Sequence, residues 1–203
     1  MRRLSQRSPI AYCLLAALLF AGCRGREELT EVPPNETVAE SVTDTVSTER
    51  DRRVATALKA KDALFKALSG RLMEVLQEDG PIAAINVCSQ EASGIAASIG
   101  QEHGVEIGRT SFRLRNPSNA PRDWVQPLVE EHTETARTIL LEDGSLGALY
   151  PIHLKVQCLM CHGGPDDILD EVKTEIAERY PQDKATGFRA GDLRGWFWVE
   201  VRE

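Results

Sequence analysis

The sequence predicts an α+β domain in which helices flank a small antiparallel sheet, and three patterns support this prediction. Apolar residues recur at helical spacing over residues 51–79 and again after Pro81. A turn signal at Glu142-Asp143-Gly144 precedes a strand-like run, and an apolar strand closes the chain after a glycine-rich loop. Helices followed by short strands without regular alternation are typical of this class.

The first two helices are predicted from their apolar stripes. The first covers residues 51–79 and stops at Gly80-Pro81. The second begins at Pro81, because proline suits the first helical position. Its stripe has spacings of 3, 4, 3 and 4 and consists of Ile85, Cys88, Ala92, Ile95 and Ile99. We therefore expect Cys88 to face the core.

Shorter elements are predicted in the second half of the chain. In chain order they are a strand (105–114), a helix (about 122–141), a strand ending at His153, a helix (about 167–180) and a strand (196–201). The strand over 105–114 has no clean alternation of apolar and polar residues, so its buried face stays undecided.

Residues 1–22 have the features of a secretory signal. They carry three arginines, no acid and an apolar run too short to span a membrane comfortably. The run ends at Cys23 in LFAGC, which resembles a lipobox, although Phe20 stands where leucine is usual. We expect cleavage before Cys23 and lipidation of its thiol. The alternatives are an ordinary cleaved signal with an incidental cysteine, or an uncleaved anchor.

The residues after the signal are expected to form a flexible acidic tether, 23–50, followed by the folded domain, 51–203. Loss of the signal leaves 21 basic and 31 acidic residues, a net charge of −10. This charge argues against a nucleic-acid partner and against adhesion to anionic lipid, so membrane attachment would depend on the lipid alone. Arg24 follows Cys23 in place of the aspartate that marks inner-membrane retention in enteric bacteria, which favours a periplasm-facing place at the outer membrane.

The cysteines point to a cofactor. Of the five in the chain, Cys13 leaves with the signal, and the three beyond Cys23 cannot all form intramolecular disulfides. Cys158-Leu-Met-Cys161-His162 fits the C-x-x-C-H sequence of c-type haem attachment. Two thiols can form thioethers to the haem vinyl groups, and the next residue offers an imidazole to iron. We predict one covalent haem c in the chain, held by Cys158 and Cys161, with His162 as an axial ligand.

Other metal chemistry stays open at this point. Cys88, Cys158, Cys161 and His162 could instead form a Cys₃His zinc site, although Cys88 lies 70 residues from the nearest other ligand. If the metal is haem iron, its second axial position could be filled by one of several side chains or left open. The candidates are Cys88, His103, His132, His153, Met73 and Met160.

Four stretches resemble the Tll0287-like (DUF3365) family of c-type haem domains. They are NVCSQEA (86–92), RTSFRLRNPSNAPRDW (109–124), YPIHLKVQCLMCHGG (150–164) and YPQDKATGFRAGDLRG (180–195). With their spacing they cover the chain from about residue 51 to the C-terminus. Val125 departs from the acid that relatives often carry there. The resemblance implies a PAS-like fold and axial ligation by His162 and Cys88, and a thiolate ligand implies a low reduction potential.

Arginines are the candidates for neutralising the haem propionates or a nearby thiolate. We assign this role to Arg109, Arg113 and Arg115, with surface solubility as the alternative. Asp192 and Arg194 are expected to pair within a tight turn and to have no chemical role.

The functions that follow are one-electron transfer to an unidentified redox partner protein, or redox sensing, in the cell envelope. A sensor of nitric oxide or carbon monoxide, which would displace the cysteine ligand, is the first alternative. A peroxidase-like enzyme is the second, and the sequence offers it no convincing distal histidine. We expect no catalytic residues.

Overall fold

A computed structural model describes residues 36–203, with side chains from residue 47 onward. The proposed signal peptide, Cys23 and the first part of the tether lie outside the described residues. Residues 37–203 form one unit, to which the following description applies. In the described part of the chain, no helix combines the length and the apolar character needed to cross a bilayer.

Helix α1 (Glu36–Glu78) is longer than the sequence suggested. Residues 36–50 were expected to belong to the flexible tether, but they continue the helix toward the N-terminus. No proline or glycine lies between Glu36 and Gly70, so nothing in the sequence interrupts the backbone hydrogen bonds. The packed part of α1 presents one fully buried stripe, Ala57, Ala60 and Leu64, to the sheet.

The second predicted helix is present but interrupted. It consists of α2 (Gly80–Asn86), a π-helical turn, η1 (Val87–Glu91), and α3 (Ala92–His103). The turn at its start has Gly80 at φ +85°, which only glycine adopts without strain. Cys88 lies inside η1. A π turn holds one residue more than an α turn, and such turns are frequent at functional sites.

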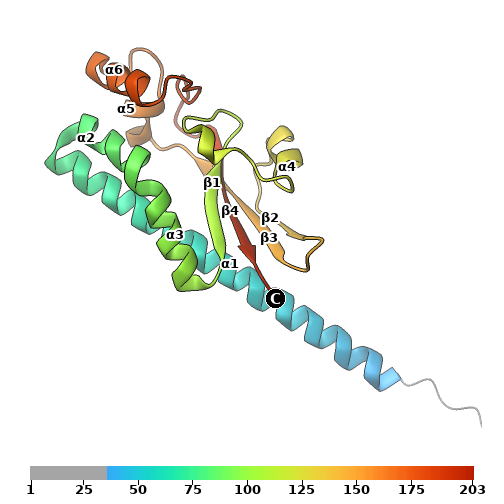
Figure 1. The fold of residues 1–203 in the computed structure, drawn as a ribbon. Helices are drawn as coiled ribbons and strands as arrows, with labels where there is room; N and C mark the ends of the chain where they lie inside the picture. Colours follow the sequence, from blue (N-terminus) through green and yellow to red (C-terminus); the bar gives the residue numbers. More distant parts are fainter. Residues whose placement is uncertain (1–35) are drawn as a thin grey trace, which may run out of the picture. The chain divides into compact units, whose positions relative to one another are not determined.

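The sheet is antiparallel throughout, as predicted, and has the order β1-β4-β3-β2. Its strands are β1 (Glu106–Thr110), β2 (Arg137–Leu140), β3 (Leu146–His153) and β4 (Leu193–Val201). One face packs against α1 and α3 through Ile107, Ala148 and Val199 (Figure 1). The other face is covered by the short α4 (Gln126–Glu130), which packs with Trp124 against Leu149 and Trp196.

The helix predicted over 122–141 is wrong. Only α4 forms, and the chain then passes through His132 at φ +49° and becomes strand β2. Residues 137–140 pair with 146–149 across the turn at 142–144, which was predicted. The Trp196 indole also donates to the Thr133 carbonyl at 2.7 Å. These long-range contacts outweigh the local helical pattern. Strand β1 likewise ends at Thr110, short of the predicted 114.

The remaining elements are short. They are the 3₁₀ turns η2 (Pro117–Asn119) and η3 (Val156–Cys158), followed by α5 (Leu159–His162) and α6 (Asp170–Arg179). Two of them, α5 and α6, lie next to α2 at one end of the sheet (Figure 1). Helix α6 packs against α2, since Val172 and Ile176 join Ile85 in one buried cluster.

Candidate haem site

A cavity of about 280 Å³ brings together the four residues on which the haem prediction depends. Cys88 comes from η1, and Cys158, Cys161 and His162 come from η3 and α5. All three cysteines are free and partly buried. The rest of the lining is mainly apolar and includes Phe65, Leu68, Leu72, Leu76, Leu154 and Phe197. An apolar wall with a few convergent donors is typical of a cofactor site.

The attachment motif is folded as two short turns. Cys158 closes η3 and Cys161 lies in α5, so consecutive turns bring both thiols to the cavity wall. Burial raises the pKa of the Cys161 thiol to about 11, and Cys88 and Cys158 are near enough to add to this rise. The Cys161 thiol is therefore protonated and uncharged at neutral pH.

His162 is held in one orientation by a backbone contact. Its Nδ1–H donates to the Ala185 carbonyl at 2.7 Å, which leaves Nε2 unprotonated and available to a metal. Burial, and then the charges of Arg115, Arg194 and Arg109, hold the pKa of His162 well below its usual range. The imidazole is therefore neutral, which is the form that coordinates metals.

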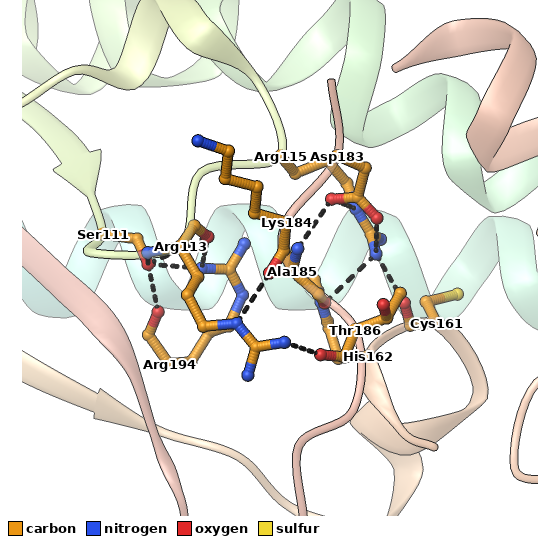
Figure 2. Close-up of polar contacts among 10 residues, drawn as sticks. All are labelled: Ser111, Arg113, Arg115, Cys161, His162, Asp183, Lys184, Ala185, Thr186 and Arg194. Carbon is orange, nitrogen blue, oxygen red and sulfur yellow. Dashed lines mark hydrogen bonds and ion pairs between the residues drawn. The ribbon is translucent and has the colours of Figure 1, made fainter. Parts of the chain in front are cut away.

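Arg115 fastens the motif to the loop that orients His162 (Figure 2). Its guanidinium donates to the Cys161 carbonyl at 2.6 Å and to the Ala185 carbonyl at 3.3 Å. It also pairs with Asp183 through contacts of 3.1 and 3.2 Å. Backbone bonds from Gly187 and Phe188 to the Gly163 and His162 carbonyls complete the attachment. Sequence reasoning missed Asp183 and Ala185, although both lie in the fourth family-like stretch.

The predicted arginines divide into different roles. Arg109 and Arg115 line the cavity, whereas Arg113 does not. Arg113 instead donates to the Lys184 carbonyl at 2.7 Å and to the Thr186 carbonyl, and its guanidinium lies 4.3 Å from the centre of the Phe188 ring. Arg113 thus supports the 184–188 loop and is not among the residues that line the cavity.

Arg194 lines the cavity, although it was expected to have no chemical role. The predicted pair with Asp192 is wrong, because Asp192 accepts from the Arg189 backbone. Arg194 Nη1 donates to Ser111 Oγ at 2.8 Å and to the Arg113 carbonyl at 3.1 Å (Figure 2). The alternation of side chains along β4 could not reveal this role, because Arg194 lies beside the strand's irregular beginning.

The candidates for the second axial position are reduced to three. Cys88, Met73 and Met160 line the cavity, and the predicted alternatives His103, His132 and His153 do not. The zinc alternative requires Cys88, Cys158, Cys161 and His162 to meet at one point. Across residues 47–203, no three side chains of His, Cys, Asp or Glu come together as a metal site. The apolar wall, the paired thiols and the neutral imidazole all fit a haem.

Comparisons with known proteins agree with this chemistry. The model of the Tll0287-like family matches residues 34–202. The crystal structure of the cyanobacterial haem protein Tll0287 aligns with a TM-score of 0.54 and 25% identity, over 76% of this chain and 96% of that one. No curated protein matches the chain.

Proposed function

The chain belongs to the Tll0287-like family, and from that premise we propose that it binds one covalent haem c and acts in one-electron transfer or redox sensing. The observation that carries the proposal is the single cavity shared by Cys88, Cys158, Cys161 and His162. The haem named for the structural neighbour supports the same assignment.

Each residue of the motif would hold the cofactor in a different way. Cys158 and Cys161 would form the two thioethers, and His162 would offer Nε2 to the iron. The Ala185 carbonyl keeps the proton on Nδ1, so the ring cannot rotate without losing a hydrogen bond. When bound, the haem supplies a one-electron couple. The largely apolar wall limits the access of water to it.

We propose Cys88 as the second axial ligand. It lies on a helix that is anchored on both sides by buried residues, Ile85 and Ala92, so its thiol has a defined position. A thiolate donates electron density, stabilises ferric iron and lowers the reduction potential. With both axial positions filled, the iron would have no open site for a substrate.

A gas sensor is the second candidate, because Cys88 lies in a π turn. A π turn can relax to an α turn, which would rotate the thiol away and free a position for carbon monoxide or nitric oxide. A peroxidase is less well supported. Among the described residues that line the cavity, His162 is the sole histidine and no carboxylate is present to act as a distal acid or base.

The place of action is also a proposal. Residues 1–22 would direct export, Cys23 would carry a lipid anchor, and the domain would face the periplasm, with the outer membrane preferred. The redox partner would be another protein of the cell envelope.

The test is expression of the full chain with a cytochrome c assembly system. Denaturing electrophoresis with haem staining, and intact mass, should show one haem that survives denaturation. Cys158→Ala combined with Cys161→Ala should abolish the stain, while Cys88→Ala should keep it. A colourless wild-type protein would refute the proposal.

A further inference from the structure

The charges around the cavity do not balance. Three arginines line it, Arg109, Arg115 and Arg194, and no aspartate or glutamate is found among the described lining residues. Asp183 neutralises Arg115 at 3.1 Å from just outside the lining. Two cations therefore remain without a carboxylate. A haem brings two propionate carboxylates, so the excess charge has the right sign and size for it. The inference that follows rests on the proposed function.

Arg194 is the first of the two cations, and its guanidinium is largely buried. Its Nε is buried and has no hydrogen-bond partner, and the two acceptors of Nη1, a hydroxyl and a carbonyl, are neutral. Burial, followed by repulsion from Arg115 and Arg109, lowers the pKa of Arg194 to about 10. A buried guanidinium without an anion is costly. This geometry therefore calls for an anionic partner in the cavity.

Arg109 lies on the neighbouring strand and faces the same cavity. It is paired in register with Phe197 of β4, and cross-strand partners project to the same face of a sheet. Phe197 lines the cavity as well. Arg109 makes no hydrogen bond or ion pair with any described side chain, so its guanidinium is available. Its charge acts on both Arg194 and His162, which places the three groups close together.

We propose that Arg109 and Arg194 bind the two haem propionates, one each, at the β1–β4 end of the cavity. Guanidinium and carboxylate groups form short, charge-assisted hydrogen bonds. Ser111 holds the Arg194 side chain in place. With both propionates neutralised, the charge of the ferric porphyrin is balanced by the Cys88 thiolate, so the oxidised site is neutral.

The experiment uses the holoprotein and compares Arg109→Met, Arg194→Met and Arg194→Lys with a control, Arg189→Met. Arg189 is exposed, lies in the loop that precedes β4 and is absent from the cavity lining. Two properties are measured: the resonance Raman band of the propionate bending mode, which reports direct contact, and the midpoint potential, which reports charge near the iron.

Each methionine variant should shift the propionate band. Each should also lower the equilibrium constant for reduction about tenfold, equivalent to about 59 mV in a one-electron couple, because an unneutralised propionate stabilises ferric iron. Arg194→Lys should restore most of the potential, and Arg189→Met should change neither property. If Arg194→Met does not fold, the propionate band and the midpoint potential of Arg109→Met alone test the inference.

An unchanged band and potential in a methionine variant that still carries covalent haem would overturn this inference and leave the proposed function standing. A wild-type protein without covalent haem would refute both.

Discussion

Replacing Asp183 with asparagine isolates the buried ion pair that holds the attachment motif. The Arg115 and Asp183 side chains are only 9% and 10% exposed, and Asp183 is the carboxylate that neutralises the guanidinium. Asparagine keeps the shape and can still accept from the Ala185 backbone, as Asp183 does at 2.9 Å. The substitution therefore removes the charge and replaces the Oδ2 atom that accepts from Arg115 Nη2 with an amide donor.

The expected loss follows from the burial of Arg115. Breaking a buried pair and leaving one charge uncompensated costs about 3–5 kcal/mol. For a chain of this length, that corresponds to a decrease of about 6–20 °C in the melting temperature. Because Arg115 also holds the Cys161 carbonyl, the losses from Asp183→Asn and Arg115→Met should not add.

Urea denaturation of the holoprotein, followed by far-ultraviolet circular dichroism and by the Soret band, measures these losses. The matched control is Glu74→Gln, which removes a carboxylate from the exposed pair with Arg71 and should cost much less than Asp183→Asn. A loss for Asp183→Asn as small as that of the control would refute the role assigned to the buried pair.

Two further predictions concern the packing of the sheet and the pH dependence of its stability. In Gly195→Ala the new Cβ would lie 2.2 Å from the backbone oxygen of Thr110 in β1, so we expect thermal denaturation to show a loss of more than about 2 kcal/mol in the free energy of unfolding. The control is Gly94→Ala, whose new Cβ would meet no atom within 4 Å and should not destabilise the protein. Equal effects of the two substitutions would contradict the packing described. Hydrogen bonds from Arg122 and then Arg202 lower the pKa of Glu106, so its stabilisation is complete above the unfolded pKa of about 4.3 and is lost as the pH falls through the lower folded value. The stability difference between wild type and Glu106→Gln should therefore shrink from pH 6 to pH 3, and a difference independent of pH would show that the carboxylate charge is not involved.

The predictable parts of the site are those that depend only on residues close together in the sequence. The C-x-x-C-H pattern needs only one turn of chain, and the stripe through Cys88 needs only helical periodicity. Both place side chains on the cavity wall, where the structure finds them. The antiparallel sheet followed from the turn at 142–144 and the apolar run that ends the chain.

The parts that were missed depend on contacts between distant segments. Ala185 orients His162 through its backbone carbonyl, and the identity of its side chain does not reveal this role. The sequence does not distinguish the roles of Arg109, Arg113 and Arg115. Arg109 lies in β1, whereas Arg113 and Arg115 follow the end of that strand at Thr110, where the alternation of side chains no longer predicts which way each one points. The helix predicted over 122–141 failed because pairing with β3 and the Trp196 contact outweigh local propensity.

The most direct test of the account is the ferric absorption and electron paramagnetic resonance spectrum of the holoprotein, compared with Cys88→Ala and with Met73→Leu. Met73 lines the same cavity, so its substitution controls for a change of packing. We predict a low-spin spectrum with thiolate character in the wild type and in Met73→Leu. Loss of that character, with a higher reduction potential, is expected in Cys88→Ala. A Cys88→Ala spectrum identical to that of the wild type would contradict ligation by Cys88.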